Sequence, residues 1–159
     1  MALAVNDLTE AGEGYQLRHP RHTAVFTVGG LTFTPRRGGP EWRWQLVVVN
    51  AGEAAADLAV HTGPMQPVND QRGVVSYLRG GLVERYVAQA DSLEQQFIIP
   101  EPLALAGADL VITGRVQSAG VFEAQPNGWR TNDFRISAMG PDGDTTYGGG
   151  RIRNLRPAA

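Results

Sequence analysis

Short runs of β-branched and aromatic residues, divided by glycine and proline, follow one another along most of this chain. In residues 41–50, four large apolar side chains alternate with other residues and therefore share one face of an extended strand. These are Trp42, Trp44, Leu46 and Val48. Twenty glycines and ten prolines supply the tight turns that many short strands need. The pattern predicts an all-β fold, an antiparallel β-sandwich of about ten short strands with jelly-roll or immunoglobulin-like topology.

Glycine-rich breaks predict where strands turn back on themselves. The predicted hairpins join residues 23–28 to 31–34 and residues 74–77 to 82–87. Further strands are expected over residues 93–99, 110–116, 121–124, 134–138 and 145–147. The expected core consists of Phe26, Trp42, Trp44, Leu46, Val48, Tyr86, Phe97, Ile112 and Ile136. We divide the chain into an N-terminal arm, residues 1–14, and a single sandwich domain, residues 15–159.

Two segments have more than one interpretation. Residues 82–97 carry apolar side chains near helical spacing, so an amphipathic helix is the alternative to a hairpin. Gly80–Gly81 before this segment and Pro100 after it favour the hairpin. The alanine-rich residues 51–59 fit either a loop or one helical turn.

Composition excludes several classes of protein. The chain has no cysteine, which excludes disulfides and cysteine-based catalysis or metal binding. Its formal net charge of −2 argues against a nucleic-acid-binding protein, because binding to phosphates normally requires a basic surface. No apolar run approaches the ~20 residues needed to span a bilayer, so we expect no membrane insertion. Residues 1–14 lack a signal-peptide pattern, so the chain is either cytosolic or a mature product without its leader.

One block of the sequence is similar to a known family. It reads Arg-Gly-Gly-Leu-Val-Glu-Arg-Tyr-Val over residues 79–87 and Ser-Leu-Glu-Gln-Gln-Phe over residues 92–97. This block resembles part of the β-rich domain that precedes FG-GAP, integrin-like repeats in secreted bacterial proteins, and residues 15–50 look like that domain's opening. Arg85, Ala88 and Gln96 replace the family's tryptophan, asparagine and second glycine, and the repeats themselves are absent. The resemblance implies an extracellular or cell-surface domain that presents or assembles rather than catalyses.

Two carboxylates in this block are the best candidates for catalysis. If residues 82–97 form a hairpin, Glu84 and Glu94 lie on neighbouring strands, and a glycosidase uses a carboxylate pair about 5–9 Å apart. The structural alternative is that each carboxylate accepts hydrogen bonds or pairs with an arginine such as Arg79 or Arg85. We favour the structural alternative and expect no enzymatic activity and no cofactor.

Metal binding has two weak candidate sites. His19, His22 and His61 are enough ligands for zinc, but Pro20 is incompatible with a helical zinc motif, so we expect these histidines in surface turns. Asp142 and Asp144 flank a glycine and begin a calcium site, although calcium needs 6–8 oxygen ligands. Ordinary turn chemistry explains both aspartates.

Two further features suggest partners. Trp129 follows Pro-Asn-Gly and is expected on a loop, where an exposed indole can stack on a sugar ring. Arg151 and Arg153 form a basic run near the end of the sequence, which fits either a solvated surface or docking to an acidic neighbour.

The arm, residues 1–14, contains Leu3, Val5 and Leu8 but belongs to no evident hairpin. Such a segment can pair with the sheet edge of a neighbouring copy, a head-to-tail arrangement that forms filaments. The alternative is a frayed terminus. The leading prediction is therefore a structural domain that self-assembles into a homo-oligomer or polymer, and the runner-up is a carbohydrate-binding or adhesion module.

Overall fold

The computed structural model describes residues 7–37, 39–52, 58–90, 92–101, 103, 105, 107–108, 110–119, 123–125, 128–131 and 134–137. Every regular element in this part of the chain is a β-strand, and neighbouring strands pair antiparallel. Within the described residues, no helix is long and apolar enough to cross a membrane. The predicted all-β sandwich is confirmed.

The strands form three sheets. The large sheet has the order β1-β2-β3-β4-β5-β10, and its strands are β1 (Asp7–Ala11), β2 (Gly14–Arg18), β3 (His22–Thr27), β4 (Gly30–Pro35), β5 (Trp42–Ala51) and β10 (Leu110–Ser118). The second sheet has the order β6-β7-β8-β9, and its strands are β6 (Val68–Gln71), β7 (Val74–Leu78), β8 (Val83–Ala88) and β9 (Leu93–Ile98). The third sheet contains β11 (Glu123–Gln125), β12 (Gly128–Thr131) and β13 (Phe134–Ser137).

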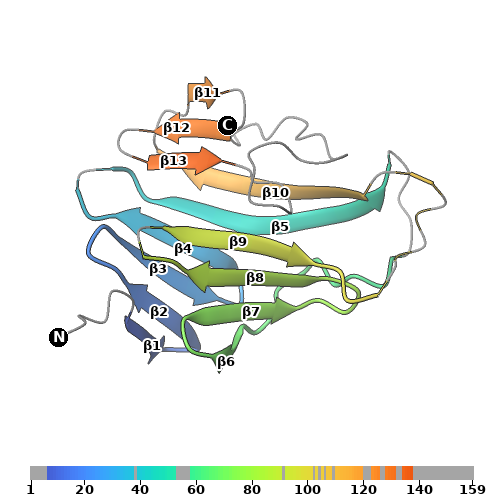
Figure 1. The fold of residues 1–159 in the computed structure, drawn as a ribbon, viewed down its shortest axis with the longest axis horizontal. Helices are drawn as coiled ribbons and strands as arrows, with labels where there is room; N and C mark the ends of the chain where they lie inside the picture. Colours follow the sequence, from blue (N-terminus) through green and yellow to red (C-terminus); the bar gives the residue numbers. More distant parts are fainter. Residues whose placement is uncertain are drawn as a thin grey trace.

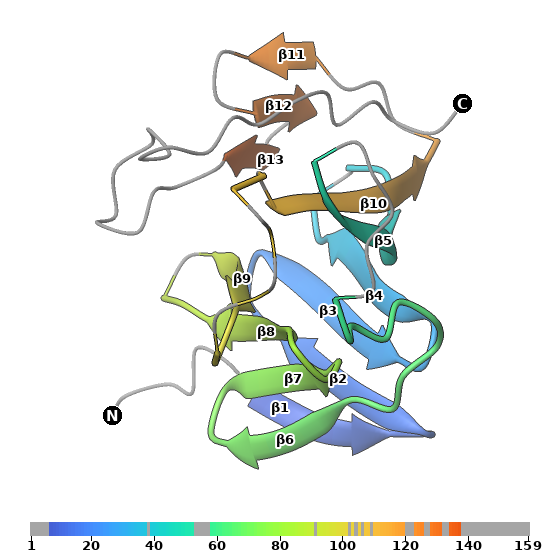
Figure 2. The ribbon, with the colours of Figure 1, turned by 90° about the vertical axis from the view of Figure 1, so that its right-hand side faces the viewer.

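The large and second sheets pack face to face and enclose the core (Figures 1 and 2). One cluster of buried side chains lies between β2–β5 and β7–β8 and includes Phe26, Trp44 and Tyr86. A second cluster includes Leu46 and Leu82. Phe97 packs against both clusters and so joins them. The sheet β11–β13 lies beyond β10, at the top of both views.

The predicted hairpins are confirmed. β3 pairs with β4, β7 with β8, and β8 with β9. The last pair settles the ambiguity over residues 82–97, which form two strands and no helix. Of the expected core, Phe26, Trp44, Leu46 and Tyr86 are buried, while Trp42, Phe97 and Ile112 are partly buried against it. The side chain of Ile136 lies outside the described residues.

Val48 is an exception among the predicted core residues. Leu46 pairs with Gly114 and Val48 pairs with Thr113, so Val47 is an extra residue that forms a bulge in β5. The bulge shifts the alternation by one, so that Val49 and Ala51 face the core while Val48 is only partly buried. The placement of Val48 in the core was wrong because the pattern of residues 41–50 was extended through this bulge.

The predicted arm is also partly wrong. Residues 7–11 form β1, which pairs with β2 around a turn at Gly12, whose φ is +60°. Leu8 packs against the core of its own chain. The Gly-Glu-Gly sequence at residues 12–14 supplies the turn between β1 and β2. Leu3 and Val5 lie outside the described residues.

Two predicted strands near the end of the sequence are present, with shifted bounds, as β11 and β13. Trp129 was expected on a loop, but it lies in β12, opposite Ala124 and Ile136. The loop prediction failed because Gln125 already pairs with Gly128, so Trp129 falls inside the paired strands. Residues 145–147, Asp142, Asp144, Arg151 and Arg153 lie outside the described residues, as do residues 53–57 of the alanine-rich stretch.

Candidate functional site

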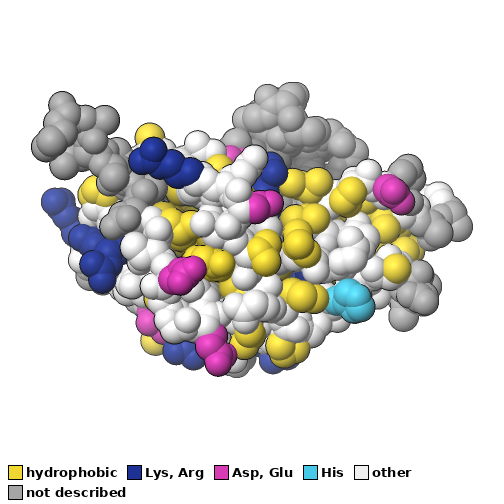
Figure 3. Space-filling view, turned by 90° about the horizontal axis from the view of Figure 1, so that it is seen from below, with side chains coloured by type: hydrophobic (Ala, Val, Ile, Leu, Met, Phe, Trp, Pro, Cys, Tyr) yellow, Lys and Arg dark blue, Asp and Glu magenta, His cyan; other side chains and the backbone are white. Residues whose placement is uncertain are grey.

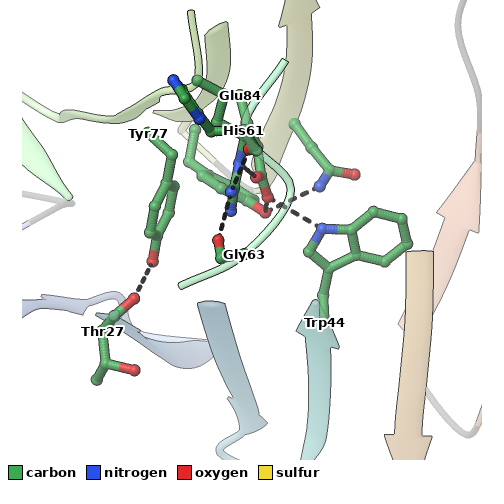
Figure 4. Close-up of polar contacts among 9 residues, drawn as sticks. Thr27, Trp44, His61, Gly63, Tyr77 and Glu84 are labelled. Carbon is green, nitrogen blue, oxygen red and sulfur yellow. Dashed lines mark hydrogen bonds and ion pairs between the residues drawn. The ribbon is translucent and has the colours of Figure 1, made fainter. Parts of the chain in front are cut away.

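The most concentrated chemistry in the described part of the chain is a set of polar side chains around the buried carboxylate of Glu84 (Figure 4). Glu84 is 1% exposed and its ion-pair partner Arg79 is 3% exposed. We call Glu84, Arg79, Trp44, Tyr86 and Gln95 the carboxylate cluster.

Both carboxylate oxygens of Glu84 accept hydrogen bonds. Arg79 Nε donates to Oε2 at 2.8 Å. Oε1 accepts from Trp44 Nε1 at 3.0 Å and from the Tyr86 hydroxyl at 2.5 Å. Gln95 Nε2 in turn donates to the Tyr86 oxygen at 2.8 Å. A carboxylate held by a guanidinium and two neutral donors is well compensated for the loss of water.

The strand register explains why these groups meet. Glu84 and Tyr86 are two residues apart on β8 and therefore point to the same, inward face. Gln95 lies directly opposite Tyr86 on β9. Trp44 reaches the same point from β5 of the facing sheet, so its bond to Glu84 joins the two layers of the sandwich.

Arg79 also fixes the connection that precedes β6. Its Nη1 donates to the carbonyl oxygens of His61 and Gly63, at 3.0 and 2.9 Å. Its guanidinium carbon lies 5.3 Å from the centre of the Tyr77 ring. Tyr77 donates its hydroxyl to the Thr27 carbonyl at 2.8 Å, a second bond between the two sheets (Figure 4).

Burial sets the protonation of both tyrosines. Desolvation, reinforced by the negative charge of Glu84, raises the pKa of Tyr77 and of Tyr86 well above the usual value for a phenol. Each hydroxyl therefore stays protonated and remains a hydrogen-bond donor across the neutral range. This is the form in which Tyr86 donates to Glu84 and Tyr77 donates to Thr27.

The register rules out the glycosidase pair considered from the sequence. Glu84 is opposite Phe97 and Glu94 is opposite Val87, so the two carboxylates lie on opposite faces of the sheet. Glu84 faces the core, whereas Glu94 accepts bonds from Gln89 and Gln96 on the outer face. The structural alternative holds for Glu84, whose arginine partner is Arg79.

A second buried polar group lies near the other end of the sandwich. His19 and His22 stack with ring centres 4.3 Å apart, and Phe33 and Trp42 extend the row at 4.7 and 4.9 Å. We call these four residues the histidine stack. Both histidines are buried, so their predicted placement in surface turns was wrong. The turn around Pro20 folds them inward against Phe33, which no local pattern in His-Pro-Arg-His reveals.

The hydrogen bonds of His19 define which ring nitrogen accepts and which donates. Its Nδ1 accepts from the Arg21 backbone N–H at 3.0 Å, and its Nε2 donates to the Ala90 carbonyl at 2.9 Å. The second bond links the large sheet to the β8–β9 turn. Burial lowers the pKa of His22 to about 4, and the positive charges of Arg21 and Arg36 act in the same direction.

These arrangements do not assemble a metal centre. His61 is exposed beside Arg79, at the opposite end of the strands from His19 and His22. Among the residues whose placement is described, no group of three or more histidine, aspartate or glutamate side chains is arranged to hold a metal ion. Sequence reasoning named Glu84 but missed Trp44 and Tyr86 as its partners, because only the pairing of strands brings them together.

Comparisons with protein-family models, curated proteins and solved structures found no match to this chain. The resemblance to the domain that precedes FG-GAP repeats therefore stays a prediction. Sugar binding by Trp129 also stays a prediction, because its side chain lies outside the described residues.

Proposed function

We propose that this chain is a non-catalytic structural domain that self-associates by β-strand addition, acting outside the cell or at its surface. The observation that carries the proposal is the outer edge of β9. In the described residues, β9 pairs with β8 on one side only. An unpaired row of N–H and C=O groups is a template for another strand.

The other edges of the two main sheets are less suitable. β6 has only four residues and an irregular register with β7, and β1 carries exposed Glu10. β10 faces the region occupied by β11–β13 (Figure 1). β9, by contrast, is regular over six residues and contains no proline. Its only charged residue, Glu94, is bound by Gln89 and Gln96 on the outer face of the sheet.

The side chains along β9 also favour an added strand. Leu93 and Phe97 point inward but are only partly buried, as is Val116 on β10. A strand laid against β9 would cover more of this apolar surface, which stabilises association by about 25 cal/mol for each Å². The closed carboxylate cluster supports a structural role, since Glu84 is shielded from solvent and saturated with donors.

Residues 1–6 are the proposed donor strand. The predicted arm covered residues 1–14, but residues 7–11 pair within their own chain, so only residues 1–6 are left as a donor. Leu3 and Val5 are two residues apart, so in a strand they share one face, as strand addition requires. Pairing this segment with the β9 edge of the next copy does not close on itself and gives a filament.

The test uses two variants that leave the core intact. Deletion of residues 1–6 removes the proposed donor but keeps Leu8 in the core. Gln95→Pro removes a backbone N–H that points away from β8. The Gln89 N–H donates to the Ser92 carbonyl, and hydrogen-bonded pairs alternate along an antiparallel ladder. Val87 and Glu94 are therefore a hydrogen-bonded pair, whereas Tyr86 and Gln95 are not. Gln95→Ala is the matched control, because it loses the same side-chain bond to Tyr86 but keeps the N–H.

We expect the intact chain and Gln95→Ala to form polymers at high concentration, and the other two variants to stay monomeric. Light scattering and negative-stain microscopy measure the size, and circular dichroism confirms that each variant is folded. A monomeric intact chain at all concentrations would refute the proposal. Polymers that persist in both the deletion and Gln95→Pro would also refute it.

A further inference from the structure

Four arginines gather at one end of the large sheet. Arg18 ends β2, Arg21 lies in the β2–β3 turn, and Arg36 and Arg37 follow β4. The two turns touch, because the Arg36 backbone N–H donates to the Arg21 carbonyl at 3.0 Å. We call these four residues the arginine corner.

The arginine corner is exposed and carries four positive charges. All four arginines are exposed, and none forms an ion pair with a described side chain. Glu41 is the first carboxylate after Arg37 in the sequence, and it is paired with Arg43 at 3.3 Å. The corner's positive field also reaches inward, since the charges of Arg21 and Arg36 both disfavour protonation of His22. In a chain with net charge −2, four guanidinium groups at one end, none with an ion-pair partner among the described side chains, form a local site for anions.

We propose that the arginine corner binds a carboxylated polysaccharide, a polymer that carries a uronate group on its sugars. The planar fork of an arginine side chain matches the two oxygens of a carboxylate. Adjacent turns hold the backbones of Arg21 and Arg36 about one strand spacing apart, roughly 5 Å, so both exposed side chains start from the same place on the surface and one polymer can contact both.

Other anionic partners fit the described surface less well. A bilayer would need apolar side chains next to the arginines. The exposed large apolar residues lie elsewhere, chiefly in the turns and strands at the opposite end: Val28, Val47, Leu78, Ile99 and Val111. Figure 3 shows one face, with arginine side chains at its left end and the largest group of apolar side chains over its middle and right. Single-stranded nucleic acid would need exposed aromatic rings for base stacking, and none is among the described exposed large apolar residues.

The site is independent of the β9 edge, so it is tested without reference to self-association. The probe is polygalacturonate, with neutral dextran, duplex DNA and anionic phospholipid vesicles as alternatives, each titrated at low and physiological ionic strength. The test variant is Arg21→Gln/Arg36→Gln. The matched control is Arg72→Gln/Arg115→Gln, which removes the same charge from two exposed arginines outside the corner.

We expect polygalacturonate to bind, added salt to weaken it, and the corner variant to bind at least about tenfold more weakly, with the control variant close to the intact chain. Equal thermal melting of the two variants establishes that both are folded. No binding of polygalacturonate, or an equal loss in both variants, would overturn the proposal. Tighter binding to DNA or to vesicles than to polygalacturonate would overturn it in favour of those partners.

Discussion

The carboxylate cluster and the histidine stack are two solutions to the burial of polar side chains between the same pair of sheets. The carboxylate cluster pairs the Glu84 carboxylate with the Arg79 guanidinium and surrounds it with the neutral donors of Trp44 and Tyr86. The histidine stack instead excludes charge, since His22 is held neutral with a pKa of about 4. One end of the sandwich thus depends on a charge being present and the other on a charge being absent.

Both clusters join the two sheets. Trp44 to Glu84 and Tyr77 to Thr27 are bonds between layers at one end, and His19 to Ala90 is such a bond at the other. They should therefore fail in different ways. Removing Glu84 leaves a buried cation and unsatisfied donors, whereas protonating the histidine stack introduces a buried cation where none is compensated.

The largest expected effect is the loss of the Glu84 carboxylate. Glu84→Ala leaves Arg79 charged and buried, and it removes the acceptor of Trp44 and Tyr86. Breaking one partner of a buried pair costs about 3–5 kcal/mol of unfolding free energy. Urea denaturation measures this loss. Glu94→Ala, which lies on the outer face of the neighbouring strand, is the control and should change stability by less than about 1 kcal/mol. Similar losses for the two variants would contradict the role of the cluster.

Acid should destabilise the end of the sandwich that contains the histidine stack. The pKa of His22 is about 4 in the folded chain against 6.5 for a free histidine, so the unfolded chain binds a proton more readily. Stability is therefore complete above pH 6.5 and falls as the pH drops from 6.5 to 4, by at most about 3 kcal/mol. Denaturant unfolding across this range measures the effect.

His22→Phe is the control for the acid effect. Phenylalanine continues the aromatic row beside Phe33 but cannot take up a proton. The variant should lose most of the decline between pH 6.5 and 4. An undiminished decline in this variant would assign the acid sensitivity to other groups.

The same two clusters mark what the sequence could and could not predict. Period-two alternation and glycine breaks predicted the strands that carry Trp44, Tyr86 and Glu84, because these signals are local. The pairing of β7 with β8 was predicted from a nearby turn. Arg79 was one of two arginines named as possible carboxylate partners, the other being Arg85, and the structure pairs Arg79 with Glu84. Trp44 joins them from 40 residues away across the sandwich, and no local pattern encodes that contact.

The predictions that were wrong also failed for physical reasons. One bulge at Val47 moved Val48 out of the core, and a polar strand with a single large apolar residue, Leu8, escaped notice as β1. His19 and His22 were assigned to the surface because histidine in a proline turn is usually exposed. Their burial depends on Phe33 and Trp42 from β4 and β5, which complete the stack.

The smallest expected loss of stability comes from removing one hydrogen bond of the carboxylate cluster. Tyr86→Phe keeps the ring beside Phe26 but removes the hydroxyl that donates to Glu84 and accepts from Gln95. Because Arg79 and Trp44 still bind the carboxylate, we expect a loss of about 1–2 kcal/mol, well below that of Glu84→Ala. Alkaline pH provides a second readout: the pKa of Tyr86 is raised, so the unfolded chain ionises first and stability falls above pH 10. Tyr86→Phe should reduce that alkaline decline, leaving the part due to Tyr77. A variant as unstable as Glu84→Ala would mean that the hydroxyl, rather than the arginine, is the main support of the buried carboxylate.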